Sequence, residues 1–299
     1  MHRAAVPEDL VLLATDSYPL SARIWRSTSA STTVAILINA GAGISARYYD
    51  SFAQYLAAHG AAVLLYDYRG IAKSRPRSLR GFSASVEEWG RKDCSAALEL
   101  LAKRFSGIPV VVIGHSVGGF VTGFVPNGRL IDRLVLIGAH TGYWRDYSKT
   151  RRLRMYALWH VIMPAVTRTI GFFPGRMLRV CEDIPAGAAL EWADRRHPDF
   201  WWNVRTKTGE LDVGRIEDAL ARFRAIHAPT VAIRFSDDPF ATAEATNRIL
   251  SLFSNCPATQ VMLGPEDTSG QPIGHFGFFR TRFRNSLWPI VLPHILSAA

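Results

Sequence analysis

Short apolar runs that alternate with segments of helical spacing restrict the fold of this chain most strongly. The first half of the sequence holds four such runs, at residues 34–38, 61–66, 110–113 and 134–138. Runs without polar alternation are typical of strands buried on both faces. Helical spacing at 46–59 and 85–105 therefore predicts a parallel sheet covered by helices on both faces. Upstream, residues 10–15 and 20–25 predict an antiparallel hairpin.

The alternation stops at about residue 139 and resumes at residue 230. Beyond that point the sequence predicts strands at 231–235 and 260–263, a helix at about 243–253, and helical structure from 276 onward. The stretch between is rich in aromatic residues and arginine and predicts helices and loops. We therefore expect an α/β core formed by residues 1–140 and 228–299, with a helical cap insertion at 141–227.

The third apolar run leads directly into Gly114-His115-Ser116-Val117-Gly118, a G-x-S-x-G pattern followed by a short helical segment. A strand before this pattern and a helix after it are the context of a nucleophile elbow, a strained turn that presents the serine. The glycines let neighbouring backbone approach where a Cβ would clash, and the helix N-terminus favours developing negative charge. A nucleotide-binding turn is the alternative, but neither G-x-G-x-x-G nor G-x-x-x-x-G-K-[ST] occurs.

With this motif, with Asp67-Tyr68-Arg69-Gly70 after the preceding strand, and with the acid and histidine described below, the chain resembles the α/β-hydrolase superfamily. It is most similar to bacterial predicted α/β hydrolases of the serine-aminopeptidase and monoglyceride-lipase-like groups. The resemblance covers about the first 140 residues and the last 70. It implies an α/β-hydrolase fold with an eight-stranded, mostly parallel sheet and a catalytic triad in the order Ser, Asp, His.

A serine hydroxyl needs a neighbouring base, and the base needs an orienting acid. In this fold the acid follows a late strand and the histidine follows the last one. Asp237 and Asp238 both follow the 231–235 strand, and Asp238-Pro239-Phe240-Ala241 fits the family pattern better. We therefore favour Asp238 and expect Asp237 to be a turn residue that bonds local backbone. His275, with glycines on both sides, is the expected base.

The remaining polar candidates are expected to surround the site or to face solvent. His115, inside the elbow, is expected to pack behind the nucleophile, and His140 is a candidate for the pocket lining. Asp93 and Glu99 are interpreted as the solvated face of the second helix.

Acyl transfer also needs hydrogen-bond donors for a transient oxyanion. In this fold one donor is the backbone N–H after the nucleophile, here Val117, and the other comes from the loop after an early strand. That loop reads Ala40-Gly41-Ala42-Gly43 and lacks the His-Gly that many relatives carry. We assign the second donor to Ala42, with Gly41 as the alternative.

The expected cap contains many large aromatic residues, which either form its own small core or line a pocket: Trp144, Tyr147, Trp159, Phe172, Phe173, Trp192, Phe200, Trp201 and Trp202. A pocket lined this way predicts an apolar acyl or aryl group in the substrate. The predicted function is that of a serine hydrolase that cleaves a carboxylic ester or thioester of a small molecule through an acyl-enzyme. No metal or organic cofactor is implied.

Other functions on the same scaffold remain open. An acyltransferase, a C–C-bond hydrolase or a lyase would use the same triad, and a non-catalytic small-molecule receptor is the more distant alternative. Haloalkane dehalogenation is disfavoured because it uses a carboxylate nucleophile, whereas this elbow carries Ser116.

The net charge of +10 does not by itself indicate a nucleic-acid partner, since no nucleic-acid-binding motif is present. The densest basic cluster, Lys149, Arg151, Arg152 and Arg154, is interpreted as a solvated helix face. The three cysteines form no CxxC pair, so neither a disulfide framework nor a zinc site is expected. No secretion-signal core and no run of about 20 apolar residues occur, so we expect a cytoplasmic protein without stable membrane insertion.

Overall fold

The computed structural model describes residues 6–29, 31–198, 204–206 and 208–296. Its centre is an eight-stranded sheet in the order β1-β2-β4-β3-β5-β6-β9-β10. The strands are β1 (Glu8–Leu13), β2 (Pro19–Trp25), β3 (Val34–Asn39), β4 (Ala61–Tyr66), β5 (Val110–His115), β6 (Arg133–Ile137), β9 (Thr230–Phe235) and β10 (Ala258–Leu263). β2 runs antiparallel to both of its neighbours, and all other pairs are parallel. The predicted hairpin and mostly parallel sheet are confirmed.

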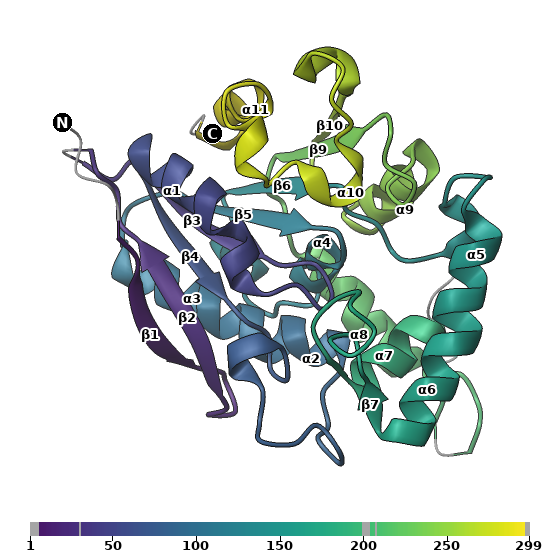
Figure 1. The fold of residues 1–299 in the computed structure, drawn as a ribbon. Coiled ribbons are helices and arrows are strands. Elements are labelled where there is room, and N and C mark those ends of the chain that lie inside the picture. Colours follow the sequence, from purple (N-terminus) through teal and green to yellow (C-terminus); the bar gives the residue numbers. More distant parts are fainter. Residues whose placement is uncertain (1–5, 30, 199–203, 207, 297–299) are drawn as a thin grey trace.

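Helices cover both faces of this sheet (Figure 1). α1 (Asp50–Ala58) and α11 (Leu287–Leu296) lie on one face, and α3 (Ser95–Arg104) and α4 (Val117–Thr122) lie on the other. The other helices of the core are α2 (Val86–Glu88), α8 (Val213–Arg224), α9 (Ala243–Leu252) and α10 (Gly274–Gly277).

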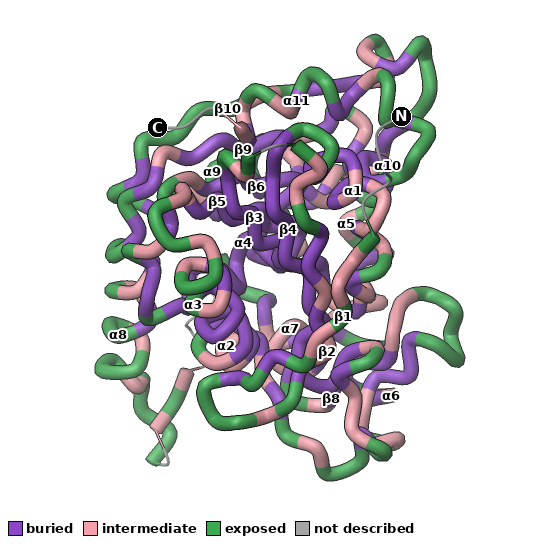
Figure 2. The backbone as a smooth tube through the Cα atoms, turned by 90° about the vertical axis from the view of Figure 1, so that its left-hand side faces the viewer, coloured by how far each residue is buried: buried purple, intermediate pink, exposed green. Residues whose placement is uncertain are grey.

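The core lies in the central strands. Every residue of β3, β4 and β5 is buried, and Figure 2 shows this buried centre surrounded by an exposed periphery. Continuous apolar sequence is what such strands require, because both of their faces contact helices. Because these strands are parallel, their carboxyl ends meet at one edge of the sheet, where the loops are free to carry polar groups.

The helical structure predicted at 85–105 is confirmed, but its middle is a π-helix that the sequence did not indicate. After α2 the chain makes a π-helical turn, Trp89–Cys94, before α3 begins. The turn brings Asp93 inward, where it is fully buried and not on a solvated face. Its carboxylate accepts hydrogen bonds from the Arg69 backbone N–H at 2.8 Å and from the Arg69 Nε at 2.7 Å. Burial raises the pKa of Asp93 to about 6, and the Arg69 contacts oppose that rise.

The expectation of helical structure from residue 276 onward is also corrected. α10 is short, a 3₁₀ turn follows at Thr281–Phe283, and α11 begins only at Leu287. The intervening aromatic residues point into the core: the Phe278 ring packs against Phe52 at 5.2 Å between centroids. Core packing thus overrides helix continuation in this segment.

The stretch expected to form a cap contains two different parts. α5 (Arg152–Ala157), a π-helical segment (Leu158–Ile162), α6 (Met163–Ile170) and α7 (Ala186–Ala193) lie beyond the carboxyl ends of the strands, with the small pair β7 (Phe172–Phe173) and β8 (Ile184–Pro185). α8 instead joins the core layer, where Phe223 packs against Phe120 and Phe253 at 5.5 and 5.1 Å between ring centroids. None of the helices among the described residues is long and apolar enough to cross a membrane.

Candidate active site

Ser116 occupies a sharp turn between β5 and α4. Its φ of 54° and ψ of −124° are unfavourable for a residue with a side chain, and such strain is held only where the surroundings enforce it. The Ser116 N–H donates to the Ile137 carbonyl at 3.1 Å. A Cβ at position 118 would lie 2.1 Å from the Asn39 oxygen, and one at position 114 would lie 2.5 Å from the Gly119 Cα. Glycine at both positions is therefore a packing requirement of this turn.

The structure brings Ser116, His275 and Asp238 into one hydrogen-bonded row. His275 Nε2 lies 2.9 Å from Ser116 Oγ, and His275 Nδ1 lies 2.7 Å from Asp238 Oδ2. All three residues are buried. Burial alone would raise the pKa of Asp238, but the His275 contact and the backbone N–H groups of residues 240 and 241 outweigh it and lower the pKa. Asp238 is thus held as a carboxylate facing the imidazole.

Asp237 has a different place from the one expected. Its carboxylate accepts hydrogen bonds from the backbone N–H groups of Ile273 and Gly274 at 2.8 and 2.9 Å, and not from neighbouring turn residues. These bonds join the loop after β9 to the loop that carries His275. The two adjacent aspartates therefore both act on the histidine loop, Asp238 on its ring and Asp237 on its backbone.

The loop after β3 passes directly beside Ser116. A Cβ on Gly41 would lie 3.4 Å from the Ser116 Cβ. The Gly41 N–H already donates to the Tyr49 hydroxyl at 2.9 Å. Within the part of the chain that the structure describes, the N–H groups of Val117 and Ala42 donate no hydrogen bond. Both are backbone donors close to Ser116 that remain available.

Tyr49 and His115 connect this loop to the histidine backbone. His115 Nε2 contacts the His275 carbonyl at 3.1 Å, so Nε2 must carry the proton. His115 Nδ1 then accepts from the Tyr49 hydroxyl at 2.8 Å, and that hydroxyl oxygen accepts from Gly41. Burial lowers the pKa of His115 to about 3, which keeps the ring neutral. Tyr49 was not predicted as part of the site, because nothing in its local sequence indicates a partner in the elbow.

Comparison with known proteins places the chain in a family. The family model described as serine aminopeptidase, S33, matches residues 30–263. The chain belongs to this family. It is an α/β hydrolase and a serine hydrolase. No curated protein matches it in sequence.

Solved structures show the same fold at low sequence identity. An esterase from Pyrococcus furiosus is 14% identical, with 98% of this chain and 91% of that chain covered and a TM-score of 0.59. A thermophilic esterase from Thermogutta terrifontis is 13% identical, with 97% and 100% covered and a TM-score of 0.60. A thioesterase domain from the curacin biosynthetic pathway is 15% identical, with 98% and 100% covered and a TM-score of 0.51.

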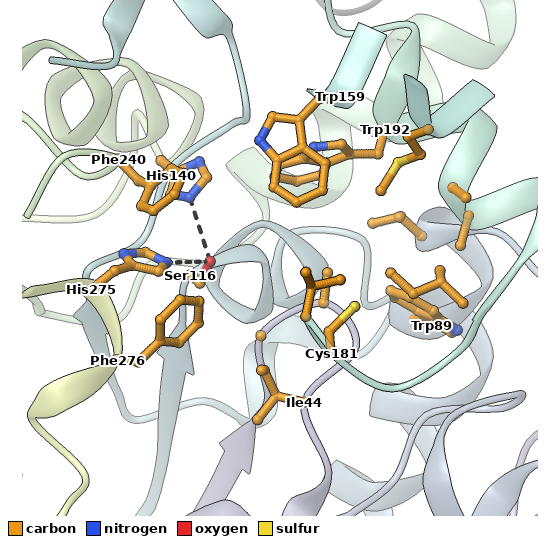
Figure 3. A pocket seen from close by; sticks show the side chains of 18 of the residues that line it. Ile44, Trp89, Ser116, His140, Trp159, Cys181, Trp192, Phe240, His275 and Phe276 are labelled. Carbon is orange, nitrogen blue, oxygen red and sulfur yellow. Dashed lines mark hydrogen bonds between the residues drawn. The ribbon is translucent and has the colours of Figure 1, made fainter. Parts of the chain in front are cut away.

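A second histidine contacts Ser116 in this S33-family hydrolase. His140 Nε2 lies 3.4 Å from Ser116 Oγ, on the loop that follows β6 (Figure 3). Burial, and secondarily the nearby His275, lowers the pKa of His140 to about 3. Its Nδ1 atom is buried without a hydrogen-bond partner among the described residues. The sequence predicted His140 as a candidate for the pocket lining, and the residue does line the cavity. Its contact with Ser116 was not predicted.

The cavity in front of Ser116 has a volume of about 100 Å³. Apart from Ser116 and the two histidines, its wall is almost wholly apolar or aromatic (Figure 3): Gly41, Ala42, Ile44, Val86, Trp89, Tyr147, Trp159, Met163, Val180, Cys181, Ile184, Ala188, Ala189, Trp192, Phe240 and Phe276. Of the aromatic residues expected in the cap, Tyr147, Trp159 and Trp192 line it, whereas Trp144, Phe172 and Phe173 do not. Phe200, Trp201 and Trp202 lie outside the described residues.

Some features of this wall were not found from the sequence. Trp89 comes from the π-helical turn of the core, which the sequence did not indicate.

All three cysteines are free thiols, and burial raises the pKa of the Cys181 thiol to about 12. Among the described residues, no three His, Cys, Asp or Glu side chains are grouped as metal ligands.

Proposed function

We propose that this S33-family hydrolase cleaves carboxylic esters or thioesters of small apolar acyl or aryl groups, with Ser116 as nucleophile, His275 as base and Asp238 as orienting acid. The observation that carries the proposal is the row of hydrogen bonds from Oγ through the imidazole to the carboxylate, at 2.9 and 2.7 Å. A nucleophile within reach of a base that is itself oriented by an acid is the arrangement that acyl transfer needs.

In the first half-reaction His275 Nε2 takes the Ser116 proton while Oγ attacks the substrate carbonyl carbon. The carbonyl oxygen becomes an oxyanion, which the N–H groups of Val117 and Ala42 stabilise. Asp238 stabilises the imidazolium and keeps its proton on the correct nitrogen. As the tetrahedral intermediate collapses, His275 returns the proton to the departing oxygen or sulfur, and an acyl-enzyme remains on Ser116.

In the second half-reaction water takes the place of the leaving group. His275 removes a proton from this water as the water oxygen attacks the acyl carbon. The bond from Oγ to the acyl carbon then breaks, Oγ regains a proton from His275, and the carboxylic acid is released. The same donors serve both oxyanions, because both intermediates form on the same carbon.

The charge of the cavity supports an ester over a peptide with a free amino terminus. Among the described residues that line the cavity there is no aspartate or glutamate. An α-amino group bound there would lose its water and gain no negative partner, which is costly. We therefore infer a neutral substrate, and the aminopeptidase activity in the family's description is not transferred to this chain.

The size of the cavity supports a short acyl or single-ring group. An engineered cavity of about 150 Å³ in another protein binds benzene, and this cavity measures about 100 Å³. Val180 and Phe276 lie at its exposed margin, with 57% and 41% of their surface accessible. A larger leaving group would extend outward past these two side chains.

We further propose that α5, α6 and α7 act as the cap within the 141–227 insertion. The π-helical segment between α5 and α6 supplies Trp159 to the cavity wall, α6 supplies Met163 and α7 supplies Trp192. A cover of this kind excludes water and strengthens the electrostatic interactions beneath it. α8 belongs to the same insertion but packs on the core, so a cap movement would leave it in place.

The test uses p-nitrophenyl esters from acetate to decanoate with the wild type and Ser116→Ala. We expect the wild type to hydrolyse the shortest esters fastest and the variant to lose turnover while its thermal unfolding is unchanged. Labelling by a serine-directed fluorophosphonate should likewise require Ser116. Turnover by Ser116→Ala at a rate near that of the wild type would contradict the proposal. Transfer of the acyl group to an added alcohol in preference to water would identify an acyltransferase instead.

A further inference from the structure

His140 is a buried histidine that the mechanism above does not use. Its residue is 2% exposed, and three aromatic rings enclose it: Tyr147 and Trp192 at 5.7 Å each and Phe240 at 6.3 Å between centroids. An apolar ring would fill such a cage without the cost of burying two polar nitrogens. A histidine in this place is therefore explained only if one of its nitrogens makes a hydrogen bond that the protein needs.

The proton on His140 follows from the row of bonds beside it. His275 Nδ1 must donate to the Asp238 carboxylate, so His275 Nε2 has a lone pair and accepts the single proton of Ser116. Ser116 Oγ has no second proton to give. The contact between Oγ and His140 Nε2 is thus a hydrogen bond only when His140 Nε2 carries the hydrogen. His140 is a neutral imidazole that points an N–H at the nucleophile.

The hydrogen bond that the His140 N–H donates is weak in the free enzyme. Its distance of 3.4 Å to Ser116 Oγ exceeds the 2.7–3.2 Å that is usual for N–H···O bonds. Catalytic hydrogen bonds are often long before substrate binds and shorten in the complex. An oxygen atom of the substrate that lies near Oγ would therefore be a better acceptor than Oγ itself.

The position of His140 identifies which substrate atom that is. Figure 3 shows His140, Phe240 and His275 together on one side of Ser116, whereas Ile44 and Cys181 lie on the other. Ile44 belongs to the loop that also carries Ala42, so the oxyanion faces away from His140. The leaving group must face His275, which protonates it. The departing oxygen therefore lies on the same side of Ser116 as His140.

We propose that His140 is a second catalytic histidine, whose Nε2–H donates a hydrogen bond to the departing oxygen during acylation and to the attacking water oxygen during deacylation. This inference rests on the proposed function. His140 keeps its proton throughout: His275 alone transfers a proton, first to the departing oxygen as the bond from carbon to that oxygen breaks, then from the water. The two oxygens occupy the same place because one step is chemically the reverse of the other.

The role predicts a dependence on the leaving group. An alkoxide concentrates negative charge on the departing oxygen and needs a donor, whereas p-nitrophenolate disperses that charge over its ring. Loss of His140 should therefore slow acylation by an alkyl ester and spare acylation by a p-nitrophenyl ester. Deacylation is the same step for both esters of one acid, and it should slow in either case.

The experiment compares His140→Phe, which fills the aromatic cage without a donor, with His140→Gln, which keeps an N–H. The matched control is His59→Phe at the C-terminal end of α1, next to the start of β4 and thus at the opposite edge of the sheet. Ethyl acetate and p-nitrophenyl acetate are the substrates. Stopped-flow release of p-nitrophenol separates acylation from deacylation, and the burst amplitude counts the folded active sites.

We expect His140→Phe to lower kcat/KM for ethyl acetate by about 10²-fold, the usual loss for one donor at a reacting oxygen. The value for p-nitrophenyl acetate should fall less than threefold, and a burst of about one p-nitrophenol per chain should precede slow turnover. His140→Gln should recover most of the loss, and His59→Phe should match the wild type.

Two results would overturn the inference and leave the proposed function standing. In the first, His140→Phe slows hydrolysis of both esters by the same factor and shows no burst. That result would indicate that the His140 ring has only a structural role. The other is His140→Phe with wild-type kinetics. A wild type that hydrolyses neither ester and resists the fluorophosphonate would reject the proposed function, and this inference with it.

Discussion

Burial of His140 makes the stability of this protein sensitive to acid, and replacing that residue should remove a defined part of the sensitivity. The pKa of His140 is lowered to about 3 by burial and by the nearby His275, against an ordinary value near 6.5. Between these two values the unfolded chain binds a proton that the folded chain excludes. The free energy of unfolding therefore falls as the pH drops below 6.5.

The size of the effect follows from the two pKa values. Each pH unit between them is worth about 1.4 kcal/mol, so at pH 5.0 the excluded proton costs about 2 kcal/mol, whereas at pH 7.5 it costs almost nothing. Other groups titrate in the same range. Burial lowers the pKa of His115 to about 3, which adds to the loss, and raises that of Asp93 to about 6, which opposes it. Only a difference between variants isolates the share of His140.

The assay is urea unfolding of the wild type and His140→Phe at pH 7.5 and at pH 5.0. Whatever the substitution does at pH 7.5, the variant should gain about 2 kcal/mol relative to the wild type on moving to pH 5.0, because the other groups cancel in the comparison. A difference that stays constant within about 0.5 kcal/mol would show that His140 is not held neutral by the fold. That result would also remove the neutral donor on which the second catalytic role depends.

Three further outcomes test other parts of the site and core. Asp238→Asn should lower kcat by about 10⁴-fold, because the amide favours the wrong tautomer of His275, and steady-state kinetics on p-nitrophenyl acetate will measure it. Asp93→Ala should cost about 3–5 kcal/mol in urea unfolding, because it leaves the buried Arg69 guanidinium with Asp16 as its remaining partner. Trp159→Ala should enlarge the cavity, so that kcat/KM rises about fourfold for each methylene added beyond acetate; a chain-length profile unchanged from the wild type would contradict the placement of Trp159 in the acyl pocket.

The centre of the sheet was predictable from the sequence because its central strands are buried on both faces. Apolar runs at 34–38, 61–66 and 110–113 mark β3, β4 and β5 to within two residues at each end. The elbow was predictable for a similar reason. A side chain at position 114 or 118 would clash with neighbouring backbone. The motif therefore reflects a packing constraint that can be seen in the local sequence.

The errors lie where a polar group finds a partner far along the chain. Asp93 faces inward because the guanidinium of Arg69 is buried there, and a π-helical turn shifts the helix to allow it. Asp237 bonds backbone 36 residues away, at Ile273. Helical periodicity and turn preferences describe neighbours within about four residues. They contain no information about such partners.

The site shows the same division. The order Ser, Asp, His came from the family resemblance, and the structure places the three favoured residues in contact. Tyr49 illustrates what the sequence does not show: its hydroxyl accepts the Gly41 N–H, so of the two candidate donors Ala42 has the free N–H. The choice between the two donors depended on a side chain from another element.

Two histidines contact one hydroxyl, but their surroundings differ. His275 faces the Asp238 carboxylate, which stabilises a positive ring, so it can accept and return a proton. His140 faces aromatic rings and has no carboxylate partner among the described residues, so protonation would leave a buried charge unpaired. Were His140 able to take a proton, it would compete with His275 for the Ser116 proton and hold it in an unproductive position. Burial of His140 removes that competition while keeping its N–H, which is the combination that a donor at the departing oxygen requires.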